Sequence, residues 1–288
     1  MTALSRTAGT QVDLLDAEAV RAAVRAAEPD VVHHLAALAH VGESWSEPAA
    51  YLRDNVAMTL NLLEAVRAEA PGAVVVVVAS SELYGPAGSL PVDETAPLRP
   101  QNPYAVSKAS ADLLAGYFAD AHGMRVIRAR AFNHSGPGQE PRYAIASFTR
   151  QVAEGVAAGA SPVVVRTGNP DARRDYTDVR DVVRAYRALA AHGEPGVYNV
   201  CSGRAASAAE LVAALGATAG VEIDHQVDPG LRRGHEVMEV RGSYERLRAA
   251  TGWQPEIPLE RTLADTVEWW LGEIRAGRAP VGGSGPQP

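Results

Sequence analysis

Cysteine and long apolar runs are nearly absent from this 288-residue sequence. Cys201 is the only cysteine, which excludes an internal disulfide and a metal site built from several thiolates. No apolar run approaches the roughly 20 residues that a membrane-spanning helix requires. The N-terminus lacks the basic region and apolar stretch of a secretory signal. A formal charge of −7 argues against nucleic acid as a partner. We therefore expect a cytoplasmic globular protein with no membrane or nucleic-acid partner.

Glycine is scarce at the front of the chain, where Gly9 is the only glycine before Gly42. A doubly wound parallel sheet normally opens with a strand, a glycine-rich turn and a helix whose N-terminus receives a pyrophosphate. Residues 2–6 instead resemble the second strand of such a sheet and the turn after it. We predict that the first strand and its helix, roughly 30–45 residues, are lacking from this sequence together with the glycine-rich loop.

Lysine is also scarce, because only one of the 27 basic residues, Lys108, is a lysine. It lies four residues after Tyr104 in the segment Tyr-Ala-Val-Ser-Lys. On a helix this spacing places both side chains on one face. A tyrosine titrates near pH 10, and a nearby ammonium lowers that pKa toward neutrality. The pair is therefore a candidate for proton transfer, although a surface pair on an amphipathic helix would show the same spacing.

Apolar runs alternate with segments of helical period along the chain, which predicts an α/β fold with a doubly wound parallel sheet. The predicted strands are residues 31–35, 74–79, 126–131, 163–165 and 197–200. The predicted helices are residues 17–27, 49–68, 104–121, 145–159, 179–191, 208–218, 243–251 and 259–276. We expect residues 280–288, rich in glycine and proline, to form a disordered tail.

Polar residues follow the predicted strand at 74–79 directly, in the segment Ser80-Ser81-Glu82-Leu83-Tyr84-Gly85. Open α/β sheets place their active sites beyond the carboxyl ends of their strands. A hydroxyl at this point could hydrogen-bond a substrate oxygen and the Tyr104 phenol. An ordinary turn would have the same composition, so this segment alone does not decide between the two readings.

Three motifs occur in a fixed order: Ser-Ser-Glu-x-Tyr-Gly at 80–85, Pro-Tyr-x-x-Ser-Lys at 103–108 and Phe-Asn-His-x-Gly-Pro-Gly-Gln at 132–139. In this order they resemble extended short-chain dehydrogenases/reductases, the NAD-dependent epimerase/dehydratase family that acts on nucleotide sugars. Within that family the chain is most similar to GDP-4-keto-6-deoxy-D-mannose reductases. The resemblance implies two lobes. Residues 1–134 and about 167–203 would bind the cofactor, and residues about 135–166 and 204–279 would bind the sugar nucleotide.

The resemblance also implies roles for particular residues. Tyr104 would be the general acid, Ser80 the catalytic hydroxyl, Lys108 the electrostatic partner and Glu82 a possible base. The implied cofactor-binding residues are Arg6, Asp13, Leu14, Leu35, Ala36, Ala37, Tyr104 and Lys108. The implied substrate-binding residues are Ser81, Asn133, Arg174, Arg233 and Glu236. We expect no metal, because the histidines have no converging carboxylates.

The implied reaction is NAD(P)H-dependent reduction of the C4 ketone of a GDP-4-keto-6-deoxy-hexose, which yields GDP-D-rhamnose. A GDP-mannose 4,6-dehydratase is the alternative, because Glu82 could serve as its base. The segment at 135–139 resembles the reductases instead. A third alternative is a protein that binds sugar nucleotides without catalysis, since the phosphate loop is lacking.

Two further expectations concern the cofactor and the assembly. NADP is preferred over NAD, because Ser5 and Arg6 lie where an acidic residue would hold the ribose of NAD. The family resemblance also implies a homodimer through a four-helix interface formed by residues 49–68 and 104–121, which are rich in alanine and leucine.

Overall fold

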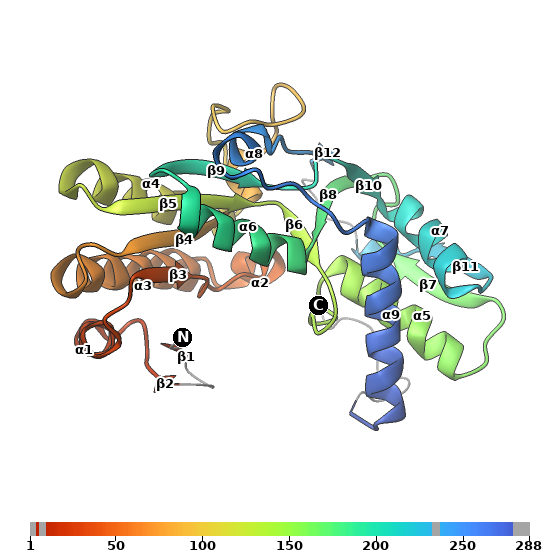
Figure 1. Cartoon of the computed structure of the whole chain (residues 1–288). Coiled ribbons are helices and arrows are strands. Elements are labelled where there is room, and N and C mark those ends of the chain that lie inside the picture. Colours follow the sequence, from red (N-terminus) through yellow and green to blue (C-terminus); the bar gives the residue numbers. More distant parts are fainter. Residues whose placement is uncertain (1–3, 6–9, 232–236, 279–288) are drawn as a thin grey trace. The chain divides into compact units, whose positions relative to one another are not determined.

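The computed structural model describes residues 4–5, 10–231 and 237–278, and it divides into two compact units (Figure 1). The first comprises Met1–Phe132, Arg184–Val200 and Tyr244–Trp253. The second comprises Asn133–Val183, Cys201–Ser243 and Gln254–Pro288. Relative to the lobes expected from sequence, residues 167–183 lie with the second unit, because the strand within them pairs only with strands of that unit. Residues 244–253 lie with the first unit, because their helix packs against its last strand.

A parallel sheet of four strands forms the centre of the first unit, in the order β3-β4-β5-β9. Its strands are β3 (Val31–His34), β4 (Val74–Ser80), β5 (Arg125–Ala131) and β9 (Gly196–Val200). The helical segments of this unit are α1 (Ala17–Ala27), α2 (Val41–Ser46), α3 (Pro48–Glu69), the 3-10 turn η1 (Ser81–Tyr84), α4 (Pro103–His122), the later part of α6 (Val179–His192) and α8 (Glu245–Thr251). The α/β class predicted from sequence is confirmed, and the strands predicted at residues 31–35, 74–79, 126–131 and 197–200 form this sheet.

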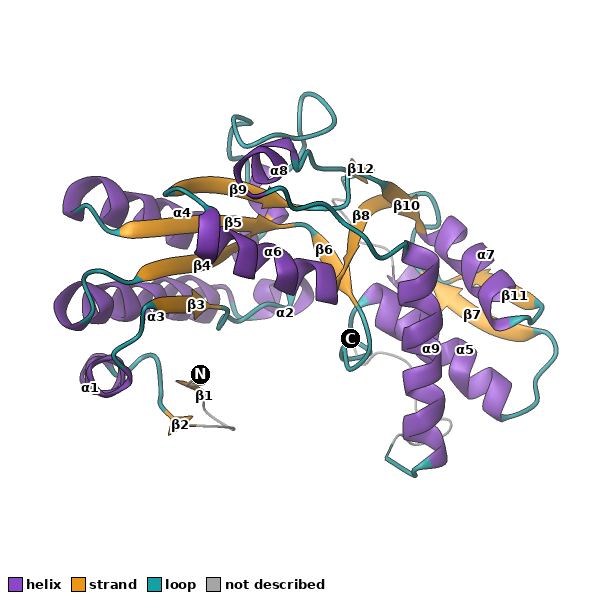
Figure 2. Cartoon of the chain, viewed as in Figure 1, coloured by secondary structure: helices purple, strands orange, loops and turns teal. Residues whose placement is uncertain are grey.

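The apolar run of β4 is buried except at Val78, which is half-buried, as is typical of a strand that has neighbours on both edges and helices packed against it. Val75 and Val77 of β4 lie in one core cluster with Leu63 and Val66 of α3 and Phe118 of α4. The helices α3 and α4 pack side by side, and α4 also packs against β4 and β5. Figure 2 shows these helices running alongside the strands. This packing fixes α4 against the end of β4.

At the N-terminus, β1 (Leu4–Ser5) pairs in parallel with β2 (Thr10–Gln11) in a small sheet of their own. Residues 2–6 were expected to supply a strand of the main sheet. Among the described residues, β1 pairs with β2 only, and β3 pairs with β4 only. Val31 of β3 is accordingly 39% exposed. The lack of a first strand and of the glycine-rich loop stays a prediction.

The second unit contains two small sheets. In one, β8 (Arg173–Asp178) pairs with β10 (Ala205–Ser207), β12 (Glu239–Val240) and β6 (Asn133–Ser135). In the other, β7 (Val163–Thr167) pairs in parallel with β11 (Ile223–Val227). The remaining elements are α5 (Ala144–Ala157), α7 (Ala208–Ala219), the 3-10 turn η2 (Pro229–Leu231) and α9 (Leu259–Arg275). The helices α5, α7 and α9 pack together with β7 around a core that includes Val165, Leu215 and Leu263.

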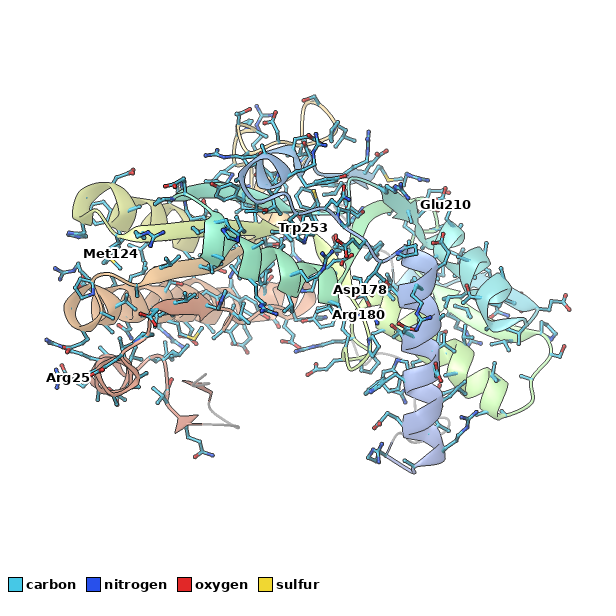
Figure 3. All side chains as sticks on the ribbon, in the orientation of Figure 1. Arg25, Met124, Asp178, Arg180, Glu210 and Trp253 are labelled. Atoms are coloured by element: carbon cyan, nitrogen blue, oxygen red, sulfur yellow. The ribbon has the colours of Figure 1, made fainter. Side chains whose placement is uncertain are left out.

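Polar contacts fix the start of two helices. Ser207 and Glu210 form a capping box at the N-terminus of α7, as the position of Ser207 before an apolar run predicts. At the start of α6, the Asp178 carboxylate accepts hydrogen bonds from the Arg180 backbone N–H and from its guanidinium, each at 2.8 Å or less. Figure 3 labels this pair.

Candidate active site

The first part of the site is the turn that follows β4. Ser80 is the last residue of the strand, and its Oγ accepts a hydrogen bond from the Glu82 backbone N–H at 3.2 Å. The 3-10 turn that begins here ends at Gly85, which has a positive φ of 58°. A Cβ at Gly85 would lie 2.0 Å from the carbonyl oxygen of Arg99, so only glycine fits this close approach. The sequence motif at 80–85 is therefore a tight turn beyond the carboxyl end of a buried strand.

The second part is the start of α4, which is joined to that turn by Asn102. The Asn102 Oδ1 accepts from the Ala105 backbone N–H at 2.8 Å and caps the helix, while Pro103 occupies the first turn. The same side chain donates from Nδ2 to the Glu82 carboxylate at 3.1 Å. One residue thus caps the helix and holds Glu82. Asparagine before proline predicts a cap, but its contact with Glu82 cannot be predicted from the sequence.

Tyr104 lies in the first turn of α4, with its ring half-buried and edge-on to Tyr51 at a centroid distance of 6.4 Å. Lys108, one turn later, is buried and donates from Nζ to the Val78 carbonyl of β4. The helix is therefore tied to the strand end at Asn102 and at Lys108, and Tyr104 lies between these two points. The structure brings Ser80, Glu82, Tyr104 and Lys108 to one end of β4, as the motif order led us to expect.

Burial lowers the pKa of Lys108 to about 8, and the carboxylate of Asp112 opposes that effect. A lysine charged near neutral pH and desolvated in this way acts strongly on neighbouring charges. Its positive charge favours the phenolate of a neighbouring tyrosine over the neutral phenol. The pair can therefore transfer a proton, with the phenol as the group that gives or takes it.

The loop after β3 is held in place by Asn55 of α3. Its side chain accepts from the Leu38 backbone N–H at 2.8 Å, and it donates to the Leu38 carbonyl at 3.1 Å and to Ser107 Oγ at 2.8 Å. His34 is also buried, and its Nε2 forms a hydrogen bond with Thr59 Oγ1 at 3.0 Å. Burial lowers the pKa of His34 to about 3. His34 is therefore neutral. No group of histidines, cysteines and carboxylates among the described residues is arranged to hold a metal ion.

The resemblance implies a nicotinamide cofactor, and the residues at β3, β4 and α4 fit its nicotinamide-ribose end. Within residues 10–231 and 237–278, the Val78 carbonyl is the one acceptor that the Lys108 ammonium reaches. Its other N–H groups are available to ribose hydroxyls. Leu35, Ala36 and Ala37 follow β3 directly, and Leu35 is 59% exposed. For the pyrophosphate end the sequence offers no glycine-rich loop.

The remaining implied residues are spread over the chain. Asp13 is exposed and accepts from the Leu15 backbone N–H at 3.0 Å, while Leu14 is half-buried against the core of the first unit. Ser81 is buried in the turn after β4. In the second unit Asn133 is exposed on β6, and Arg174 is half-buried on β8 with Nη1 donating to the Arg173 carbonyl at 2.9 Å. Arg6, Arg233 and Glu236 lie outside the described residues.

The chain is similar to several nucleotide-sugar enzymes. A family profile described as GDP-mannose 4,6 dehydratase matches residues 4–266. The GDP-6-deoxy-D-mannose reductase of Pseudomonas aeruginosa is 40% identical over 250 residues, which is 86% of this chain and 82% of that protein. The dTDP-glucose 4,6-dehydratase of Streptomyces griseus is 34% identical over 282 residues, which is 93% of this chain and 81% of the relative.

Solved structures show the same fold. The structure of RMD from Pseudomonas aeruginosa in complex with NADPH superposes with a TM-score of 0.85 at 38% identity, covering 91% of this chain and 88% of that one. The UDP-glucose 4-epimerase of Thermotoga maritima, solved with UDP-glucose, gives a TM-score of 0.84 at 28% identity, covering 94% and 86%. Matches that span most of the chain, together with the Tyr104–Lys108 pair, establish that the protein belongs to the extended short-chain dehydrogenases/reductases, the NAD(P)-dependent enzymes that modify nucleotide sugars.

Proposed function

We propose that this protein reduces the C4 ketone of a GDP-4-keto-6-deoxy-hexose and so forms GDP-D-rhamnose. The observation that carries the proposal is the 40% identity to a GDP-6-deoxy-D-mannose reductase over 86% of the chain. The segment Gly136-Pro137-Gly138-Gln139 supports it, because this segment resembles the reductases rather than the dehydratases.

The proposed chemistry assigns one task to each residue at the end of β4. A bound reduced nicotinamide supplies the hydride. Ser80 Oγ donates a hydrogen bond to the ketone oxygen and polarises the carbonyl. Tyr104 gives its phenolic proton to that oxygen as negative charge develops on it. Lys108 holds positive charge beside the phenol and stabilises the phenolate that remains. Glu82 lies in the turn after Ser80, where the Asn102 side chain holds its carboxylate, and it is proposed to contact the sugar.

Ser81 is one of the residues proposed to bind the sugar nucleotide. Asn133 and Arg174 contribute an amide and a guanidinium. Arg233 and Glu236 complete the proposed set. Arginine suits diphosphate recognition because its planar fork donates two parallel hydrogen bonds to phosphate oxygens.

NADP(H) is the proposed cofactor, in preference to NAD(H). The similar structure from Pseudomonas aeruginosa was solved with NADPH. Ser5 and Arg6 lie in the segment that corresponds to the end of the second strand, where a hydroxyl and a cation suit a 2′-phosphate.

A GDP-mannose 4,6-dehydratase is the second candidate, favoured by the description of the matching family profile. A curated GDP-mannose 4,6-dehydratase of Yersinia enterocolitica is 29% identical over 287 residues. In that reaction Glu82 would remove the C5 proton after oxidation at C4, and water would leave from C6. The residues at the end of β4 could serve both reactions, so the substrate that the protein converts distinguishes the reductase from the dehydratase.

The proposed function is tested by supplying each substrate separately. With GDP-4-keto-6-deoxy-mannose, the protein should consume NADPH and form a GDP-6-deoxyhexose. With GDP-mannose alone it should form no keto sugar. Tyr104→Phe is the control and should lower kcat by roughly 10²–10⁴-fold with little change in nucleotide binding. Conversion of GDP-mannose alone would establish the dehydratase instead. A protein that retains no nicotinamide cofactor and turns over neither substrate would be a binding protein.

The proposed assembly is a homodimer in which α3 and α4 of each subunit form a four-helix interface. Large apolar side chains are exposed on both helices. Leu52 and Leu60 of α3 are each 39% exposed, and Leu113 and Tyr117 of α4 are 60% and 57% exposed. Leu113 and Tyr117 are four residues apart and therefore lie on one face of α4. A second copy would remove this apolar surface from water.

A further inference from the structure

Four buried polar side chains in the first unit form a network that the proposed chemistry does not use. These residues are Asp112 of α4, Arg130 of β5, Tyr84 of η1 and Asn199 of β9. We call them the Asp112–Asn199 network. All four are buried, and each exchanges a hydrogen bond with the next. The network therefore joins four elements that are up to 115 residues apart in sequence.

The contacts are well defined. Arg130 donates to both carboxylate oxygens of Asp112, from Nη2 at 2.7 Å and from Nε at 3.2 Å. Its Nη1 donates to the Tyr84 hydroxyl at 3.0 Å. That hydroxyl donates in turn to Asn199 Oδ1 at 2.7 Å. Asn199 is fixed by two further contacts, from Nδ2 to the Val92 carbonyl at 3.0 Å and from its backbone N–H to Glu94 at 2.7 Å.

The protonation states of Tyr84 and Arg130 agree with these donor and acceptor roles. Burial raises the pKa of Tyr84 to about 12, so its hydroxyl stays protonated and donates to Asn199. Burial would lower the pKa of Arg130, but its hydrogen bonds to Asp112 outweigh that effect and raise it. The guanidinium remains charged. A buried ion pair is weak as a source of stability, because the cost of desolvating both charges offsets their attraction. The pair is better explained by the fixed positions that it gives to α4 and β5.

Both ends of the network adjoin the proposed catalytic residues. Asp112 follows Lys108 by one turn of α4, so it lies on the same face of that helix. Tyr84 is the last residue of the turn that begins after Ser80 and contains Glu82. The catalytic groups thus occur on two separate segments, and the network is a buried connection between those segments through the side chain of Arg130.

We propose that the Asp112–Asn199 network is a positioning device, in which Arg130 and Tyr84 set the spacing between the Ser80–Tyr84 turn and the Tyr104–Lys108 helix. This inference rests on the proposed function for its catalytic consequence. The Tyr84 hydroxyl is the most informative atom, because among the described residues it is the group whose hydrogen bonds join Arg130 to Asn199. Without it, the turn keeps its covalent connection to β4, the contact of the Tyr84 ring with Phe132 and the stacking of the Arg130 guanidinium on that ring, so the variant removes the hydrogen bonds alone.

The test replaces Tyr84 by phenylalanine, which removes only that hydroxyl. The matched control is Tyr198→Phe on β9, since Tyr198 is also buried and its hydroxyl donates to the Glu194 carbonyl at 3.0 Å without touching the network. Tyr84→Phe should lower kcat by about 10-fold while the KM for the sugar nucleotide stays unchanged, because small displacements of reacting groups are costly. Tyr198→Phe should leave kcat unchanged.

A second measurement needs no turnover. Hydrogen–deuterium exchange of the peptide covering residues 78–86 should speed up in Tyr84→Phe and not in Tyr198→Phe, because this peptide contains the turn. Wild-type kcat in Tyr84→Phe, or an equal loss in both variants, would overturn the proposal. If the wild-type protein reduces no sugar nucleotide, the proposed function fails by itself. In that case the exchange decides alone, and unchanged exchange in Tyr84→Phe overturns the positioning role.

Discussion

The ammonium of Lys108 changes its charge in the pH range of an enzyme assay. Its pKa is lowered to about 8 by burial, so it is charged below that pH and neutral above it. The proposed reduction needs a protonated Tyr104 and a charged Lys108. The rate of reduction should therefore fall as the pH rises through about 8.

Lys108→Arg tests this assignment through the pH profile of kcat. A guanidinium stays charged up to pH 12 and above, so the residual activity should lose the fall near pH 8. It should also be at least about 10-fold slower than the wild-type protein, because the planar fork does not fit the position of an ammonium. The same fall near pH 8 in Lys108→Arg would assign it to another group.

His34 is predicted to make the fold sensitive to acid. Its pKa is lowered by burial to about 3 from an ordinary 6.5. The unfolded chain takes up a proton below pH 6.5 while folded His34 stays neutral, so stability is present above 6.5 and lost as the pH falls toward 3. At about pH 5 the loss from this residue is about 2 kcal/mol.

The measurement compares Tm at about pH 7 and about pH 5 in His34→Gln and in the wild-type protein. The wild-type decrease should exceed that of the variant by roughly 4–8 °C. His192→Gln is the control, because His192 is exposed at the end of α6 and should leave the wild-type decrease unaltered. Equal decreases in wild type and His34→Gln would show that His34 is not buried neutral.

Arg6 tests the choice of cofactor. Arg6→Asp should move the preference from NADPH toward NADH, because a carboxylate repels the 2′-phosphate and accepts from the ribose hydroxyls of NAD. The ratio of kcat/KM with the two reduced cofactors is the measurement. An unchanged ratio would remove Arg6 from the cofactor site.

Sequence motifs predict which residues form the site, and they do not show the contacts that hold those residues together. Tyr104 and Lys108 are readable because a helical spacing of four residues is local. The contact between Asn102 and Glu82 joins residues 20 apart, and that between Tyr84 and Asn199 joins residues 115 apart. Composition shows that such residues are polar, but burial and partners arise only when the sheet and helices pack.

At the scale of elements, segments with an apolar pattern are predictable in both units. The strands β4 and β5 and the helices α3 and α4 are predictable because their apolar residues are continuous or helically spaced. The strand β8 reads Arg-Arg-Asp-Tyr-Thr-Asp and has no apolar pattern. It forms a strand because β6, β10 and β12 all pair with it. Asp175 within it is buried and accepts from Ser202 and from the backbone of Gly203 and Gly242. Tertiary pairing of this kind is not visible in local sequence.

The proposed dimer is tested on α4. Leu113→Arg should raise the dimer dissociation constant by about 30-fold or more, since an unpaired charge in an interface costs about 2–5 kcal/mol. Light scattering at micromolar concentration should then report a monomer for the variant and a dimer for the wild-type protein. Val183→Arg, at an apolar residue that is 51% exposed in the second unit, should remain a dimer. A monomeric wild-type protein would contradict the proposed interface.

At the scale of the whole molecule, the chain is an NAD(P)-dependent nucleotide-sugar enzyme. Its first unit is built around a four-stranded parallel sheet, and its second unit contains the sheet around β8 and the pair of strands β7 and β11. No helix among the described residues has the length and apolar character to cross a membrane. The proposed catalytic residues Ser80, Glu82, Tyr104 and Lys108 belong to the first unit, while Asn133 and Arg174 belong to the second. In the proposed reaction the hydride passes from the reduced cofactor to C4 of a keto sugar.

The most direct test of that claim is the position of an isotope label. The protein is incubated with GDP-4-keto-6-deoxy-mannose and NADPH carrying deuterium at the transferred position, and the product is analysed by NMR. We expect a GDP-6-deoxyhexose that carries one deuterium at C4, and one oxidised cofactor for each product molecule. Tyr104→Phe should slow this transfer without moving the label. Unchanged keto sugar and unconsumed NADPH in this incubation, together with conversion of GDP-mannose to the keto sugar in a separate one, would contradict the proposed reduction and establish the dehydratase.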